Sequence, residues 1–291
     1  MSRQNTFLLG LGAQKAGSTW AQDYMAQDPV ADFGPIKEYH VWDVLHLPHA
    51  QHFDRRTRNP MRSKAEATLR RLLGKGPDVA GIRGALQTAP RDYFDFFTTL
   101  LDRPGITLTG DITPLYAGLP PEVLKQIRDG FEARGIAVRA LFLMRDPVSR
   151  CVSAAQMNRR KSDRNEGVPT GGTLDEAVLA YAQSPQARLR GDYRHTVESL
   201  RAVFPEQALY FGLYETMFTL DSLAALSRFA GVSLRPELAR RRVNAFRKSE
   251  GVSERTRANL RDILEPEYAF CLQAFPETAN HWMRKDAPSH S

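Results

Sequence analysis

The N-terminal segment constrains the fold most strongly, because an apolar run there stops at a glycine-rich loop. Residues 7–11 read Phe-Leu-Leu-Gly-Leu, a short run that favours a buried parallel strand. Residues 12–19 read Gly-Ala-Gln-Lys-Ala-Gly-Ser-Thr, and helical spacing of apolar side chains follows at 20–27. A strand, a glycine loop and a helix in this order expose backbone N–H groups at the helix N-terminus. This arrangement predicts a site for phosphate or a similar anion.

Strands and helices continue to alternate along the chain. This alternation indicates an α/β fold with one central parallel β-sheet and helices on both of its faces. No linker or internal repeat is visible, so we expect a single domain over residues 1–291 with its core at about 7–275. The remaining expected elements are strands at 107–110, 136–144 and 208–212, helices over most of 44–100 and at 148–160, 190–204, 220–230 and 253–275, a polar loop at 161–172, and a capping box from Thr173 to Glu176.

The glycine loop differs from the P-loop of nucleotide hydrolases, G-x-x-x-x-G-K-[ST]. Gly12 and Gly17 have the required spacing, but Ser18 stands at the lysine position and Lys15 lies two residues before Gly17. A kinase or NTPase needs that lysine after the glycine, together with Mg²⁺. The loop is therefore P-loop-like, and it disfavours a nucleotide kinase or NTPase without removing that alternative. A structural loop with an incidental lysine is the other reading.

Two motifs resemble those of the sulfotransferases that use 3′-phosphoadenosine 5′-phosphosulfate (PAPS). The first, Gln-Lys-Ala-Gly-Ser-Thr-Trp at residues 14–20, resembles the loop that binds the 5′-phosphosulfate. The second is a strand that ends in Arg145-Asp-Pro with Ser153 eight residues after the arginine, similar to the family's 3′-phosphate motif. An arginine at a strand end can donate two hydrogen bonds to a phosphate. The resemblance implies a PAPS site formed by Gln14, Lys15, Ala16, Gly17, Ser18, Thr19, Trp20, Arg145 and Ser153, with Lys15 also catalytic.

A third segment is similar to a Lys-Glu-x-His-Phe-Phe-Asp stretch of the heparan-type sulfotransferases. It reads Lys37-Glu-Tyr-His-Val-Trp-Asp43. The resemblance implies that Glu38 is the catalytic base and that His40 assists it, although the two could exchange roles. A carboxylate serves as a base near neutral pH if burial raises its pKa.

The segment that corresponds to the acceptor pocket resembles the heparan-type subgroup less closely. Residues 110–116, Gly-Asp-Ile-Thr-Pro-Leu-Tyr, are similar to a segment that lines the acceptor pocket, but Ile112 replaces its lysine. This loss puts a heparan-like acceptor in doubt. The resemblance implies acceptor contacts from Lys37, Asp111, Thr113 and Tyr116. Arg247 and Lys248 occupy the place of a basic loop over the nucleotide, and Tyr193, Tyr214 and Glu215 are interpreted mainly as scaffold.

The charge of the chain fits an anionic partner. Lys and Arg number 40 against 33 Asp and Glu, which gives a net charge of +7. The sequence has neither zinc-finger spacing nor the aromatic and basic pattern of proteins that bind single-stranded nucleic acid, so a nucleic-acid partner is not expected. The basic stretch at 55–75 fits contact with an acidic surface. The two cysteines have no metal-ligand spacing and are expected as reduced thiols packed in helices. Without a signal-peptide core or a long apolar run, we expect a cytoplasmic protein. The resemblance to the heparan-type sulfotransferases and their bacterial relatives implies a protein of bacterial type.

These patterns together predict a PAPS-dependent sulfotransferase that needs no metal and releases 3′-phosphoadenosine 5′-phosphate (PAP). The sulfuryl group would pass by in-line displacement to a hydroxyl or amine of a saccharide, a lipid headgroup or a small molecule. A P-loop-like kinase or NTPase and a non-catalytic PAP-binding protein remain as alternatives. The identity of the acceptor and the oligomeric state stay open.

Overall fold

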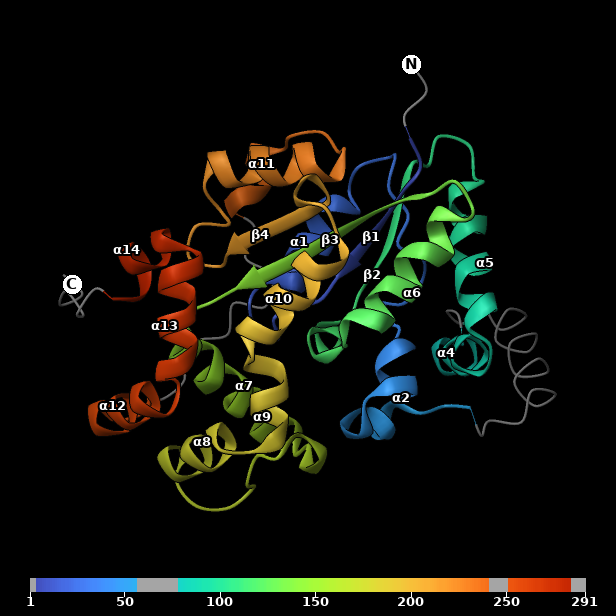
Figure 1. The fold of residues 1–291 in the computed structure, drawn as a ribbon. Helices are drawn as coiled ribbons and strands as arrows, with labels where there is room; N and C mark the ends of the chain where they lie inside the picture. Colours follow the sequence, from blue (N-terminus) through green and yellow to red (C-terminus); the bar gives the residue numbers. More distant parts are fainter. Residues whose placement is uncertain (1–3, 57–77, 241–250, 284–291) are drawn as a thin grey trace.

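Four parallel strands form the centre of the molecule. The computed structural model describes residues 4–56, 78–240 and 251–283. Its sheet has the strand order β2-β1-β3-β4 (Figure 1). Phe7 and Leu9 of β1 lie in register with Thr109 and Asp111 of β2. The strands are β1 (Thr6–Gly10), β2 (Leu108–Ile112), β3 (Ala137–Met144) and β4 (Leu209–Leu213), each within two residues of its predicted position.

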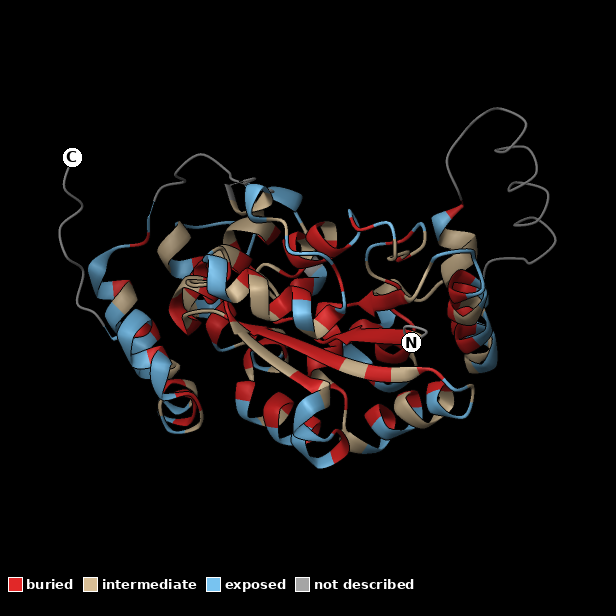
Figure 2. Ribbon diagram, turned by 90° about the horizontal axis from the view of Figure 1, so that it is seen from above, coloured by how far each residue is buried: buried red, intermediate tan, exposed pale blue. Residues whose placement is uncertain are grey.

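Helices cover both faces of this sheet, as the sequence predicts for an α/β fold (Figure 2). β1 and β2 are buried along their whole length; β1 is mainly apolar, as expected for a buried parallel strand, whereas β2 also buries Thr109 and Asp111. In Figure 1, α6 and α10 lie in front of the strands, and α1 and α11 lie behind them. The helices around the sheet are α1 (Ser18–Met25), α5 (Pro90–Leu101), α6 (Pro121–Glu132), α10 (Tyr193–Val203) and α11 (Leu220–Ala230).

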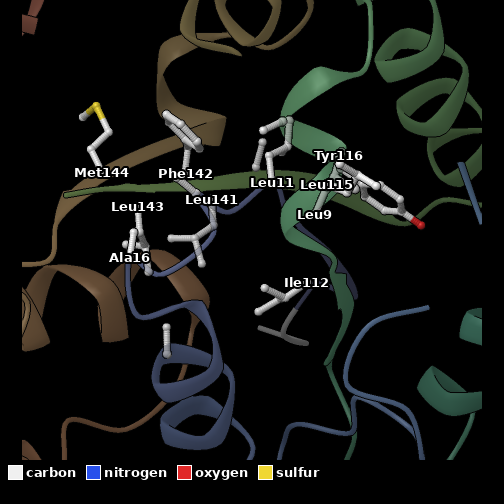
Figure 3. Packing of buried hydrophobic residues seen from close by; sticks show 14 of the residues in the cluster. Leu9, Leu11, Ala16, Ile112, Leu115, Tyr116, Leu141, Phe142, Leu143 and Met144 are labelled. Atoms are coloured by element: carbon white, nitrogen blue, oxygen red, sulfur yellow. The ribbon is translucent and has the colours of Figure 1, made fainter. Parts of the chain in front are cut away.

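The core is packed from both sides of the strands. The ring of Phe7 stacks on Phe131 of α6 with centroids 3.8 Å apart and meets Phe97 of α5 edge-on at 5.0 Å. Along β3, Phe142 points to one side and Leu143 to the other, toward the loop that carries Ala16 (Figure 3). The core therefore reaches to the base of the glycine loop and fixes where that loop begins.

Short helices gather at the carboxyl ends of the strands. They build the layer in which the predicted site residues lie. These elements are α2 (Trp42–His46), η1 (Pro48–Phe53), α4 (Val79–Thr88), η2 (Pro114–Gly118), α7 (Pro147–Lys161), η3 (Arg164–Glu166), α8 (Leu174–Ala182) and α9 (Pro185–Gly191).

Two predicted helices are each divided in the structure. The helix expected at 253–275 is α12 (Glu254–Ile263) and α13 (Glu265–Ala274), because Leu264 leaves helical geometry and Pro266 begins the next helix. The helix expected at 190–204 is divided at Asp192, whose side chain caps α10 by accepting from the N–H of His195. The remaining short elements are η4 (Glu206–Ala208), η5 (Pro236–Arg240), η6 (Pro276–Thr278) and α14 (Ala279–Trp282).

Most of the segment 161–172 is exposed, as its polar sequence indicates, but Glu166 and Val168 are buried. Glu166 forms an ion pair with Arg190, which connects this segment to α9. The capping box from Thr173 to Glu176 is present as predicted. Cys151 and Cys271 are free thiols buried in α7 and α13, in agreement with the sequence. None of the described helices is long and apolar enough to cross a bilayer.

Candidate active site

The strand order predicts a crevice between the carboxyl ends of β1 and β3. The chain leaves β1 toward β2 on one side and later returns to β3 on the other, so the connections diverge at this point. Ligands of open α/β sheets bind at such a point, outside the carboxyl ends of the strands. The glycine loop starts here along β3: the N–H of Leu143 donates to the Gly12 carbonyl over 2.7 Å, and the N–H of Ala13 to the Leu143 carbonyl over 2.6 Å.

The loop has the backbone geometry of an anion site. Lys15 has φ +70°, in the left-handed region that non-glycine residues rarely adopt, and Gly17 at the N-cap of α1 has φ +91°. A Cβ on Gly17 would also lie 2.5 Å from the Sδ of Met217, so the position requires glycine. The loop thus presents Lys15 beside the N-terminus of α1, where the helix dipole favours negative charge.

Arg145 reaches the same loop from the end of β3. Its Nη1 donates to the carbonyl oxygen of Lys15 over 3.0 Å, and its guanidinium lies 4.4 Å from the ring centroid of Tyr214. The hydroxyl of Tyr193 donates to the Arg145 carbonyl over 2.8 Å. The structure thus brings together the two predicted anion-binding residues, which lie 130 positions apart in the sequence.

Lys15 lies in a strongly cationic environment. Burial lowers the pKa of Lys15, and the positive charges of Arg145, Arg160 and Lys161 lower it further. Its Nζ contacts the Sδ of Met157 at 3.7 Å, and it forms no ion pair with a carboxylate of the described residues. Positive groups that repel one another and are partly withdrawn from water are stabilised by a bound anion.

The other nucleotide candidates surround this loop. Ser18 and Ala16 are buried, and Trp20 packs on Tyr24 with ring centroids 5.2 Å apart. Gln14 and Thr19 are half-buried, and Ser153 is half-buried on α7, the helix that follows Arg145. Arg247 and Lys248 lie outside the described residues.

Glu38, His40 and Asp43 form a hydrogen-bonded row. The Nδ1 of His40 lies 2.6 Å from the Oδ2 of Asp43, and its Nε2 lies 3.2 Å from the Oε2 of Glu38. The His40 side chain is 4% exposed and Asp43 is fully buried, whereas the Glu38 side chain is 43% exposed. The sequence analysis assigns no role to Asp43. Its position three residues after His40 was the feature that could have indicated this contact.

The electrostatics of this row correct one expectation. Burial acts to raise the pKa of Glu38, but the hydrogen bond from His40 and the charges of His40, Arg190 and Lys161 outweigh it, so the pKa lies below its ordinary value. Burial acts to lower the pKa of His40, and its bonds to Asp43 and Glu38 raise it overall. The pair is therefore a carboxylate beside an imidazole that favours its charged form, and burial does not raise the pKa of Glu38 toward neutrality.

Asp111, Thr113 and Tyr116 are fully buried, so as they lie they do not reach an acceptor. The hydroxyls of Thr113 and Tyr116 donate to Asp111 over 2.6 and 2.7 Å. Thr113 also accepts from the N–H of Tyr39 over 3.0 Å, and Tyr116 accepts from the N–H of Val41 over 3.1 Å. These three residues, predicted as acceptor contacts, instead hold the backbone of the segment that carries Glu38 and His40.

Three further candidates have partners that define their roles. Lys37 is exposed and pairs with Asp23 over 2.9 Å, so its ammonium is directed away from the row next to it. Tyr214 lies under Arg145, and the Oε1 of Glu215 accepts from the N–H of Asp146 over 2.9 Å. The scaffold interpretation of Tyr214 and Glu215 thus becomes specific, because both hold the turn that carries Arg145.

Comparisons with known proteins identify the fold. No family model and no curated protein matches the chain. Among solved structures, a sulfotransferase from Alicyclobacillus acidocaldarius matches with a TM-score of 0.62 at 19% identity, over 98% of this chain and 100% of that one. A sulfotransferase from Mycobacterium avium matches with a TM-score of 0.50 at 13% identity, over 94% of this chain and 78% of that one. The chain has a sulfotransferase-like α/β fold.

Proposed function

We propose that this protein is a PAPS-dependent sulfotransferase that transfers a sulfuryl group to a hydroxyl or amine. The observation that carries the proposal is the contact between Arg145 and the Lys15 carbonyl, which joins two cationic motifs in one crevice. The sulfotransferase-like fold supports it independently. A donor with phosphate groups on the 3′ and 5′ oxygens of one ribose requires two neighbouring cationic sites of this kind.

The residues of the crevice suit such a donor. Lys15, Arg145, Arg160 and Lys161 concentrate positive charge at the end of α1 and β3, where backbone N–H groups add further donors. Ser18 stands where an NTPase carries its phosphate-binding lysine, so the loop favours PAPS over a magnesium nucleotide. Arg145 and Ser153 would hold the 3′-phosphate, and residues 14–20 the phosphosulfate.

Lys15 is assigned to the leaving group. PAPS supplies a sulfuryl group bonded to its 5′-phosphate, and transfer breaks that S–O bond as the acceptor oxygen or nitrogen bonds to sulfur. Negative charge then grows on the bridging oxygen of the phosphate. The ammonium of Lys15 and the N–H groups of Gly17 to Thr19 stabilise this charge, since cations and amide dipoles fixed beforehand stabilise charge that develops in a transition state. The N–H of Ala16 already donates to the Ala13 carbonyl over 3.1 Å.

Glu38 is assigned as the group that takes the proton from the acceptor. Its side chain is 43% exposed, and its lowered pKa keeps it ionised at neutral pH. His40 is nearly buried with both ring nitrogens engaged, so it orients Glu38 instead of meeting the acceptor. Asp43 fixes the imidazole from the opposite side, and all three therefore act through the single carboxylate of Glu38.

Calorimetric titration with PAP, and separately with ATP and Mg²⁺, tests the class of donor. We expect PAP to bind and ATP–Mg²⁺ not to bind; the opposite result would identify a kinase or NTPase. PAP release from PAPS is then measured with panels of saccharides, lipid headgroups and small hydroxyl or amine compounds. PAP binding without release for any acceptor would indicate a non-catalytic PAP-binding protein.

A further inference from the structure

The backbone that carries Glu38 and His40 is held from two sides. Its N–H groups are bound by Thr113 and Tyr116, which follow β2. Its carbonyl groups are bound by α4, a helix to which the sequence assigned no functional role. The Nη2 of Arg83 donates to the Glu38 carbonyl and the Nε2 of Gln87 donates to the His40 carbonyl, each over 2.5 Å.

The spacing of these two donors matches the segment they hold. Arg83 and Gln87 are four residues apart and so lie on one face of α4. Glu38 and His40 are two residues apart, and their carbonyls accept from consecutive turns of that face. The helix therefore binds Glu38, the proposed catalytic base, and His40 through separate side chains.

Gln87 uses its whole amide in this arrangement. Its side chain is fully buried. Its Nε2 also donates to the Phe53 carbonyl over 3.2 Å, and its Oε1 accepts from the N–H of Arg55 over 2.8 Å. The ring of Phe53 stacks on the imidazole of His40 with centroids 3.6 Å apart. One amide thus fixes both the backbone of His40 and the ring against which His40 packs.

His40 needs such support because its backbone is strained. Its φ is +53°, a left-handed conformation that costs a non-glycine residue on the order of 1 kcal/mol or more. In this conformation its ring nitrogens reach Asp43 and Glu38. Without a bond to its carbonyl, the peptide can relax and withdraw the ring from one carboxylate or both.

We propose that Gln87 is a positioning residue that keeps His40 in the orientation needed to bind Glu38, with Arg83 holding the preceding turn. That this pair is catalytic rests on the proposed function, whereas the positioning does not. Asp43 and Glu38 face His40 directly, and Arg83, Arg190 and Lys161 are the cations around Glu38.

Gln87→Met tests the role of the amide, with Gln51→Met as the matched control. Gln51, which is exposed, also donates its amide to a backbone carbonyl, that of Val44, over 2.8 Å, and it has no hydrogen bond to His40 among the described residues. The titration of His40 is followed by NMR of ¹³C-labelled histidine, with the signal assigned by its loss in His40→Gln. We expect Gln87→Met to lower the pKa of His40 by about half a unit or more, toward the ordinary value, and Gln51→Met to leave it in place.

PAP binding separates this proposal from the proposed function. PAP should bind Gln87→Met within about twofold of the wild-type affinity, because the crevice at Lys15 is untouched. If wild-type protein does not bind PAP, the proposed function fails while the His40 titration still decides the role of Gln87. An unmoved His40 titration in Gln87→Met, or an equal shift in Gln51→Met, overturns the proposal.

Gln87→Glu keeps the proposal testable if Gln87→Met does not fold. A protonated carboxyl can donate to the His40 carbonyl and accept from Arg55 as the amide does, whereas an ionised one cannot donate. PAP release with the best acceptor of the panel should be near wild type at acidic pH and fall by about tenfold or more, relative to wild type, once the introduced carboxyl ionises. A constant ratio to wild type across pH would contradict a positioning role.

Discussion

Lys15 combines a left-handed backbone with partial burial and three cationic neighbours, and the burial and the like charges are unfavourable unless an anion binds. These features predict that the affinity for PAP depends on pH. In the free protein the pKa of Lys15 is lowered, and a bound phosphate must raise it again. Affinity should therefore fall as pH rises through the lowered pKa of Lys15, by up to about tenfold per unit.

Calorimetry from neutral to alkaline pH, in buffers of different ionisation enthalpy, measures this decline and the protons taken up on binding. Lys15→Ala should bind PAP more weakly, lose this pH dependence and lower turnover by about 10²-fold or more. Lys125→Ala removes an exposed lysine that pairs with Asp129 on α6 and is the control. A wild-type decline that persists unchanged in Lys15→Ala would assign it to another group.

Substitution of Glu38 should change turnover without changing the affinity for PAP. Glu38→Gln keeps the shape of the side chain but cannot accept a proton, so turnover should fall by about 10²- to 10⁴-fold. PAP affinity should not change, since the proposed function assigns Glu38 to the acceptor and not to PAP. Steady-state PAP release and calorimetry on the same preparation measure both quantities. If Glu38→Gln retained wild-type turnover, Glu38 would not be the base.

The turn from β3 to α7 shows how one element supports the site. Asp146 caps α7 by accepting from the N–H of Ser149 over 2.8 Å, and its other oxygen accepts from the hydroxyl of Tyr268 over 2.5 Å. Its own N–H donates to Glu215. Asp146→Ala should therefore lower the free energy of unfolding by about 1–2 kcal/mol and also weaken PAP binding, because Arg145 is the preceding residue.

Thr173→Ala provides the comparison for this prediction. Thr173 caps α8 in its capping box and has no contact with Arg145 among the described residues. Its loss should lower stability by a similar amount, about 1 kcal/mol, without changing PAP affinity. Denaturant unfolding and calorimetry of both variants measure the two effects. Equal PAP affinities in the two variants would show that the Asp146 turn does not position Arg145.

At the scale of elements, the sequence predicts what is set by local pattern. All four strands and the capping box at Thr173 follow from short runs of residues, and the structure confirms them. The prediction of one helix at 253–275 was wrong, because Pro266 interrupts a continuous helix but is well suited to the first turn of a new one. Burial of Asp111 was not predictable, since its hydroxyl partners include Tyr93, 18 residues away on α5.

At the scale of the molecule, the topology decides which predicted residues meet. The motifs at Lys15 and Arg145 could be recognised separately, but their contact depends on β1 and β3 being neighbours in the sheet. The role of Gln87 had no local signal, because its amide acts on a backbone 47 residues away. Motifs thus predicted which cationic residues lie together, and the fold was required to find the residues that hold them in place.

The whole fold should lose stability as pH rises from acidic to neutral values. Burial and the charge of Asp192 raise the pKa of Glu267 to about 7, although it accepts from the N–H of Tyr193; burial also raises the pKa of Asp111 to about 6. Between their ordinary values and these, the folded chain holds protons that the unfolded chain releases, so stability falls as pH rises. Glu166, whose pKa is lowered to about 2, acts oppositely: its contribution is lost as pH falls below about 4.5.

Glu267→Gln isolates one of these groups, because an amide oxygen can still accept from Tyr193 and carries no charge at any pH. The variant should lose less stability than wild type between about pH 4.5 and 7, by on the order of 1–3 kcal/mol. Denaturant unfolding at steps of pH measures the difference, and Glu265→Gln, exposed on the same helix, is the control. Parallel curves for wild type and Glu267→Gln would mean that Glu267 ionises in the fold as it does in the unfolded chain.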